Sequence, residues 1–216
     1  MRSEELIRLR IREVLATPCI GRLVESYFEP DGPFAGATFD LLGENPPHAF
    51  TRDDLLATTL LDISWRPLAV RGLLATGSDV SAQLAGIASD VDLWNAQRDV
   101  LDAATSLHNS LCELAGVGPV IASKLLARKR PRLIPIHDKV VLRVLSPPKN
   151  RFWETLATAL HMRMLREEIE ALRPANVGSA SLLRLLDVAI WARHSGSRAA
   201  RIARAAAGVS EPDSTS

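Results

Sequence analysis

The stretch that decides what this chain is expected to be is Leu114–Leu145, LAGVGPVIASKLLARKRPRLIPIHDKVVLRVL. It predicts a Gly-Val-Gly turn at residues 116–118, a helix that begins at Pro119, an extended piece over Leu133–Ile136, and a second helix that begins after Asp138. Glycines in such a turn adopt positive φ readily and leave backbone amides uncovered. Proline suits the first helical position because no intrahelical N–H bond is lost there. The stretch therefore predicts two helices that meet across a short hairpin.

Positive charge is concentrated in the same part of the sequence. Between Leu114 and Trp153 there are nine basic residues and one acidic residue, Asp138, which gives this segment a net charge of +8. The whole chain carries +1, so the remainder carries −7. A local positive field on a nearly neutral protein predicts a polyanionic partner. The alternative is a solvated helix face that happens to be basic.

The composition is that of an ordinary globular protein. The chain has 216 residues, of which 47% are hydrophobic and 24% charged, and this length suits one large domain or two small helical lobes. No apolar run is long enough to span a bilayer, and the beginning of the chain does not resemble a signal peptide. Two cysteines are too few for a disulfide framework, which indicates a cytoplasmic protein. The histidines share no spacing with carboxylates that indicates a metal site, and no cofactor is expected.

Hydrophobic periodicity elsewhere in the chain predicts an all-α fold. The expected helices cover residues 3–15, 20–28, 51–63, 65–74, 80–88, 93–114, 152–172, 179–193 and 198–207. Thr51 is the expected N-cap of its helix, and Pro67 is expected in the first turn of the next.

One long loop rich in proline and glycine is predicted near residues 29–50, pinned to the body of the protein by its apolar residues. We expect a single helical domain over residues 1–210, followed by a disordered tail at 211–216. The alternative is two lobes, one of residues 1–90 with 151–207 and one of residues 91–150.

The predicted hairpin has the features of a phosphate site. The second helix presents its N-terminus, which carries the positive end of the helix dipole. Lys124 and Arg128 lie four residues apart on one face of that helix, and Val117 is expected to pack inward and fix the turn. The simpler alternative is that the two glycines only terminate a helix.

Asp138 has two interpretations. As the residue before the helix at 139–145 it is a natural N-cap. As a carboxylate in a segment of charge +8 it should be well ionised, because nearby cations favour the charged form. In that role it would serve as a base, a water-positioning group or an electrostatic stabiliser.

These residues resemble the helix-hairpin-helix DNA glycosylase superfamily. That superfamily shows a hairpin L-P-G-[VI]-G-x-x-[TS]-A, followed about fifteen residues later by an Asp that opens a helix. The hairpin is matched here by Gly116, Val117, Gly118 and Ala122, and the second half by Asp138, Val141, Arg143, Val144 and Leu145. The resemblance covers about thirty residues.

The resemblance implies a glycosylase-like helical fold and duplex DNA as the partner. The backbone of Gly116, Val117 and Gly118 would grip phosphates, with Lys124, Arg128 and Lys139 as further contacts, and Asp138 would act when the glycosidic bond breaks. Members that also cleave the strand carry a lysine where this chain has Val120, so lyase chemistry through that residue is excluded. The usual four-cysteine iron–sulfur cluster is not expected, because neither cysteine follows the motif.

Over nearly its whole length the chain also resembles an uncharacterised bacterial protein family of unknown function. The resemblance rests on four segments: Phe39-Asp40, Thr51–Ala57, Ser123–Pro131, and Leu185–Asp187 leading to Trp191. It implies no activity.

Three functions are therefore open from the sequence. The first is a DNA-binding protein that acts as a monofunctional DNA glycosylase through Asp138. The second is a nucleic-acid-binding module in which Asp138 is only a helix cap. The third is a helical protein that binds another protein and no nucleic acid. Similarity of fold does not decide among them.

Overall fold

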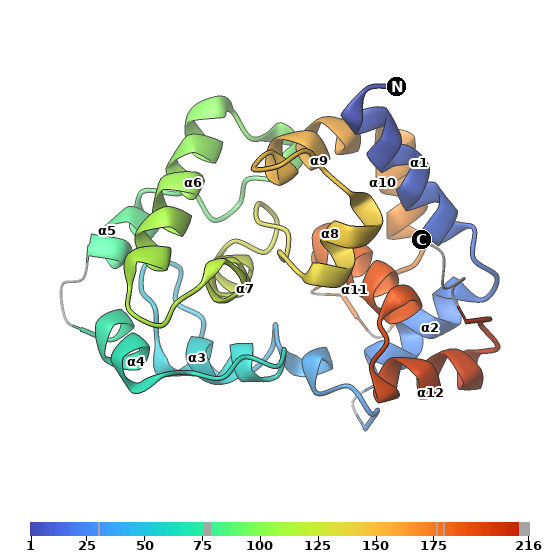
Figure 1. Ribbon diagram of the computed structural model, residues 1–216, viewed down its shortest axis with the longest axis horizontal. Coiled ribbons are helices and arrows are strands. Elements are labelled where there is room, and N and C mark those ends of the chain that lie inside the picture. The colour runs from blue at the N-terminus through green and yellow to red at the C-terminus, as the bar shows by residue number, and fades with distance from the viewer. Residues whose placement is uncertain (30, 76–78, 176, 179, 212–216) are drawn as a thin grey trace. The chain divides into compact units, whose positions relative to one another are not determined.

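The computed structural model describes residues 1–29, 31–75, 79–175, 177–178 and 180–211. Within these residues the chain forms helices and irregular segments without a β-strand, which confirms the predicted all-α class (Figure 1). The more specific glycosylase-like fold stays a prediction. Of the tail expected to be disordered at 211–216, all but Glu211 lies outside the described residues.

The chain is divided into two compact units. Unit 1 comprises Met1–Ala37 and Asp138–Ser216, and unit 2 comprises Thr38–His137. These boundaries differ from the lobe boundaries expected near residues 90 and 150. A short 3-10 turn, η1 (Ala35–Thr38), carries the chain from unit 1 into unit 2.

Unit 1 is built around α11. Its helices are α1 (Ser3–Leu15), α2 (Ile20–Tyr27), α8 (Lys139–Leu145), α9 (Phe152–Leu160), α10 (Arg163–Glu170), α11 (Leu182–His194) and α12 (Arg198–Ala207). Helix α11 contacts α1, α2, α8, α10 and α12 and lies between α8 and α2 (Figure 1). Nearly every residue of α11 from Leu183 to Ala192 is buried, including the charged Arg184 and Asp187.

Unit 2 is built around the pair α6 and α7. Its helices are α3 (Arg52–Thr59), α4 (Pro67–Leu73), α5 (Asp79–Ala85), α6 (Arg98–Glu113) and α7 (Pro119–Lys129), with a 3-10 turn η2 (Leu93–Asn95) before α6. Helix α7 contacts both α6 and α3, and α5 contacts α6 (Figure 1). No helix among the described residues is long and apolar enough to cross a membrane.

Local sequence signals at helix ends are confirmed at several positions. The Thr51 side chain accepts a hydrogen bond from the Asp54 N–H, and the Asp54 carboxylate accepts one from the Thr51 N–H, which forms a capping box. Pro67 and Pro119 occupy the first turns of α4 and α7. These signals are local, so they depend little on the rest of the fold.

Two helices expected to be continuous are broken. The segment 93–114 forms η2 and then α6, because the buried Leu93 donates its N–H to the Arg132 carbonyl and the chain must turn to enter α6. The segment 152–172 forms α9 and α10, which are separated at His161 and Met162. The Arg166 guanidinium donates to the Leu160 and His161 carbonyls and so stabilises the end of α9.

Candidate functional site

The predicted Gly-Val-Gly turn joins α6 to α7. The Val117 N–H donates to the Leu114 carbonyl at 2.9 Å, and the Val117 side chain is buried as expected. Gly116 adopts a φ of +92°, a conformation that other residues rarely take. Gly116 is therefore needed for the shape of the turn.

Gly118 differs from Gly116 because it leaves space open. It is the N-cap of α7 with φ −99° and ψ 174°, a backbone conformation that most residues adopt. A Cβ built on Gly118 meets no atom within 4 Å. Because α7 begins at Pro119, the amides of its first turn have no intrahelical acceptor. Gly118 therefore leaves open space beside the positive end of the α7 dipole.

A cation that the sequence did not single out lies beside the turn. Arg66 is the N-cap residue of α4, and a Cβ built on Gly116 would lie 3.2 Å from both the Cβ and the Cδ of Arg66. The aliphatic part of Arg66 therefore runs along Gly116. The residue is exposed, and no described residue forms a hydrogen bond or ion pair with its guanidinium. Only the packing of α4 against the turn brings Arg66 here, so no pattern in the sequence indicates it.

The two cations predicted to contact phosphate on α7 lie in the interior of unit 2. Lys124 is 7% exposed, and its Nζ donates to the Leu61 carbonyl at 2.6 Å. Arg128 is 1% exposed. Its Nε donates to Asp54 Oδ1 at 2.9 Å, and its other two nitrogens donate to the carbonyls of Phe39 and Leu42. The sequence predicted a surface position for both cations, and the structure instead places both among buried acceptors.

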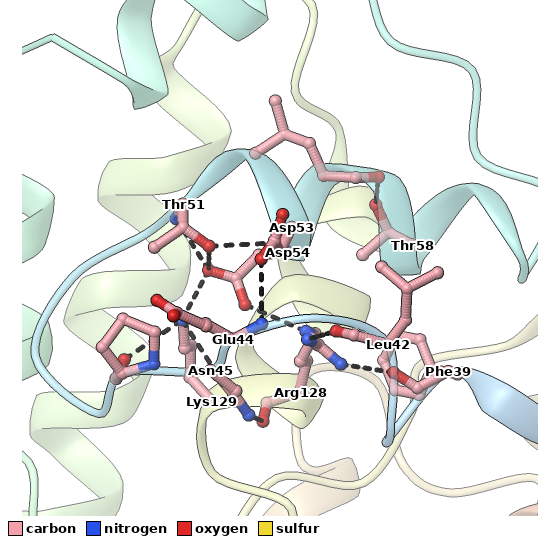
Figure 2. Close-up of polar contacts among 12 residues, drawn as sticks. Phe39, Leu42, Glu44, Asn45, Thr51, Asp53, Asp54, Thr58, Arg128 and Lys129 are labelled. Carbon is pink, nitrogen blue, oxygen red and sulfur yellow. Dashed lines mark hydrogen bonds and ion pairs between the residues drawn. The ribbon is translucent and has the colours of Figure 1, made fainter.

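Asp54 is the carboxylate that pairs with Arg128 and with its neighbour Lys129, which is also buried. Its Oδ2 accepts from Lys129 Nζ at 2.5 Å, from the Thr51 N–H at 2.7 Å and from the Thr51 hydroxyl at 3.1 Å. Figure 2 shows Asp54 between Thr51 on one side and Arg128 and Lys129 on the other. One fully buried carboxylate therefore balances two buried cations.

Other donors of this basic block hold the loop that precedes α3, and Arg130 also donates to the Leu84 and Ile87 carbonyls at and after the end of α5. Lys129 also donates to Asn45 Oδ1 (Figure 2) and to the Pro46 carbonyl. Arg130 donates to the Pro47 carbonyl. A loop without regular secondary structure must find partners for those of its carbonyl groups that lie away from water. The basic block supplies those partners, which explains why so many cations are found in the interior.

Burial has an electrostatic effect on Lys129. Burial lowers the pKa of Lys129, because removal from water disfavours the ammonium form, and the hydrogen bond to Asp54 partly offsets this. The neighbouring Arg128 and Arg130 also lower it. Asp54 is therefore essential to the charge balance of the network.

Asp138 is an N-cap. Its Oδ1 accepts a hydrogen bond from the Val140 N–H at 2.7 Å at the start of α8, and the side chain is half-buried. Lys139, the next residue, is exposed. Asp138 and Lys139 open the second segment of unit 1, whereas the Gly116–Gly118 turn belongs to unit 2. A catalytic role for Asp138 stays a prediction.

A second buried arginine network lies in unit 1. Arg184 on α11 donates to Asp187 Oδ2 at 2.7 Å, to the Tyr27 hydroxyl at 3.0 Å and to the Gly36 carbonyl at 2.9 Å. Tyr27 also stacks on Phe34 with ring centroids 4.9 Å apart. Neither this network nor that of Arg128 was predicted from the sequence.

The comparisons with known proteins give a class and a family. The chain is a helical protein of two compact units whose interiors each contain an arginine–aspartate pair. The model of a family described as "Family of unknown function (DUF6308)" matches residues 20–194, so the chain belongs to that family. Neither the curated proteins nor the solved structures contain a match.

The four segments that carry the resemblance to the family of unknown function contribute to the two buried arginine networks. Three of them, Phe39-Asp40, Thr51–Ala57 and Ser123–Pro131, contribute residues to the network around Asp54. The fourth contributes Asp187 to the network of Arg184. These segments therefore hold the interior together.

Proposed function

We propose that this protein binds the phosphate backbone of duplex DNA through the turn between α6 and α7, without hydrolysing a glycosidic bond. The observation that carries the proposal is the exposed Arg66 beside Gly116, next to the open N-terminus of α7. Backbone amides at a helix N-terminus are a favourable environment for phosphate. An arginine adds a charged donor that pairs with phosphate oxygens. The resemblance of the turn to the helix-hairpin-helix motif supports the same conclusion.

The proposal differs from the sequence expectation in the cations that it uses. Lys124 and Arg128 are engaged by buried acceptors, so their charge serves the fold. Arg66 takes their place as the charged group beside the turn. Asp138 is accounted for as the cap of α8, which is why binding without catalysis is the simpler proposal.

Gly118 provides the test, because a side chain fits there without strain. Gly118→Asp places a carboxylate at the N-cap, where Asp is a favoured residue, so the fold should be kept or slightly stabilised. The same carboxylate would occupy the phosphate position and repel DNA. Gly118→Ser is the matched control, because serine is an equally good cap without a charge.

The measurement is the affinity for a fluorescently labelled duplex of about 20 base pairs at low salt. We expect Gly118→Asp to weaken binding by about tenfold or more, as for the loss of a charged hydrogen bond of about 1.5–3 kcal/mol. Gly118→Ser should weaken it by no more than about threefold. If wild-type protein binds no duplex, or if the two variants bind alike, the proposal is wrong. Incubating the duplex with wild-type protein should leave no abasic sites.

A further inference from the structure

We infer that Arg204 in unit 1 is the base of an oxyanion-binding site, which the carboxylate of Glu211 occupies in this structure. The site would take a phosphate group in place of Glu211. This inference concerns the C-terminal segment after α12 and does not rest on DNA binding at the turn of unit 2.

Arg204 is held rigidly but one of its donors is unused. The residue lies on α12 and is 1% exposed. Its Nη1 donates to the carbonyls of Ala192 and Ser195 at 2.8 and 2.9 Å, beside the C-terminal end of α11. Its Nη2 donates to Glu211 Oε2 at 2.7 Å, and its buried Nε has no hydrogen-bond partner among the described residues. An unsatisfied buried donor is costly.

The exposed pair of Arg132 and Asp92 in unit 2 shows what a complete contact looks like. There Nε donates to one carboxylate oxygen at 2.7 Å and Nη2 donates to the other at 2.9 Å, so the same edge of the guanidinium is fully used. Arg204 uses only half of this edge for Glu211. An oxyanion with suitably spaced oxygens would satisfy both nitrogens, which is the geometry that guanidinium groups offer to phosphate.

The surroundings of Arg204 favour an anion. Arg143 donates to the His194 carbonyl at 3.0 Å, and Arg193 donates to the Ser210 carbonyl at 2.6 Å, so two further arginines lie at the end of α11 and beside the segment that carries Glu211. Burial, together with Arg193, Arg143 and Arg204, lowers the pKa of His194 to about 4. Burial is the largest cause of this shift, and the three arginines add a positive local potential to it.

Glu211 is suited to be a displaceable occupant. Its side chain is 60% exposed, although its partner is buried. The segment that carries it is attached by the buried Val209 and by the contact between Arg193 and the Ser210 carbonyl. Movement of Glu211 alone would therefore free Nη2 of Arg204, beside the unpaired Nε, while the contacts of Val209 and Ser210 stay in place. An ion pair with one exposed partner is weak, so a phosphate dianion can compete with it.

The experiment compares phosphate binding by the full-length protein and by Glu211→Gln. A glutamine keeps the size of the side chain but removes the competing charge, and a neutral acceptor binds a guanidinium about half as strongly. Isothermal titration with inorganic phosphate in a chloride buffer should give a dissociation constant about tenfold lower for Glu211→Gln than for wild type. Glu13→Gln is the matched control, because Glu13 is an exposed glutamate of α1 without an ion pair to a described residue.

The outcomes are distinct. The inference is overturned if Glu211→Gln and Glu13→Gln bind phosphate equally, or if none of the three proteins binds it. Arg204→Lys is a second variant that keeps the positive charge but loses the paired Nε and Nη2 donors. It should lose the gain produced by Glu211→Gln when the two substitutions are combined, with folding checked by circular dichroism.

A second arm identifies the source of the phosphate group. If Glu211→Gln strengthens binding of inorganic phosphate but not of the labelled duplex, the site takes a small phosphorylated molecule. If both improve, the site takes backbone phosphates. Gly118→Asp should leave phosphate binding at Arg204 unchanged, so failure of DNA binding at the turn would be seen separately.

Discussion

Arg128 in unit 2 and Arg184 in unit 1 each neutralise a buried aspartate, but their aspartates lie at different distances along the chain. Each is buried, pairs with one aspartate and donates to backbone carbonyls. Arg184 finds Asp187 one turn away on its own helix, whereas Arg128 finds Asp54 seventy-four residues earlier. The first pair is a local feature of α11, and the second exists only because α3 and α7 pack together.

The two arginines also hold neighbouring residues of the segment that passes from unit 1 to unit 2. Arg184 binds the Gly36 carbonyl at the end of the first segment of unit 1, and Arg128 binds the Phe39 carbonyl at the beginning of unit 2. A buried guanidinium thus binds a backbone carbonyl on each side of Ala37. Buried ion pairs add little net stability when intact, but they are expensive to break.

The largest effect should follow from Asp54→Asn. The asparagine side chain could still accept a hydrogen bond, but Arg128 and Lys129 would be left buried without a balancing charge. We expect a loss of about 3–5 kcal/mol in the free energy of unfolding, measured by urea denaturation. The neighbouring Asp53→Asn is the control, because among the described residues Asp53 accepts a hydrogen bond from the Glu44 N–H, at 2.8 Å, and from no other group. Its substitution should cost about 1 kcal/mol. Equal losses for the two variants would contradict the network.

A smaller loss is expected from Asp187→Asn. Asp187 is paired with Arg184, and Arg184 keeps its bonds to the Tyr27 hydroxyl and the Gly36 carbonyl when Asp187 is replaced. We expect about 1.5–3 kcal/mol, the range for a hydrogen bond to a charged group. The same urea titration measures it. A loss larger than that of Asp54→Asn would reverse the ranking of the two networks.

The stability of unit 1 should depend on pH through His194. The pKa of His194 is lowered to about 4 in the folded protein and is 6.5 ordinarily, so between these values the unfolded state binds a proton that the folded state does not. Stability should therefore fall as the pH falls from 6.5 to 4, by about 1–2 kcal/mol after allowance for partial exposure. His194→Gln should remove this part of the pH dependence.

His137 in unit 2 is the comparison for this prediction. Burial and the nearby His108 also lower the pKa of His137, but no arginine contributes to the shift. His137→Gln should therefore change the acid limb of the stability curve less than His194→Gln does. Thermal unfolding between about pH 4 and pH 7 measures both. A larger change for His137 would contradict the assignment of the positive potential to the end of α11.

The sequence predicted the parts of the fold that depend on neighbouring residues. The Thr51 cap, Pro67 in the first turn of α4 and the inward packing of Val117 all follow from local chemistry, and all are confirmed. The breaks before α6 and between α9 and α10 were missed because contacts from Leu93 and Arg166 terminate those helices. Helical propensity alone does not contain such contacts.

The candidate site also depends on tertiary contacts that the sequence alone does not show. A count of charges does not say which charges face water, so the +8 segment predicted a basic surface although Lys124 and Arg128 are buried. One signal was present, namely a loop of apolar and proline residues at 29–50 that needed donors for its carbonyls. Arg66 had no signal, since its place beside Gly116 comes only from the packing of α4.

We propose that the buried cations of α7 stabilise the interior of unit 2, and that Arg66 beside the turn binds DNA phosphate. The most direct test is the salt dependence of duplex binding for wild type, Arg66→Gln and Arg52→Gln, an exposed arginine at the start of α3. Loss of one phosphate contact should reduce the slope of log affinity against log salt by about one for Arg66→Gln. The slope of Arg52→Gln should equal that of wild type. Identical slopes for Arg66→Gln and wild type would contradict the account.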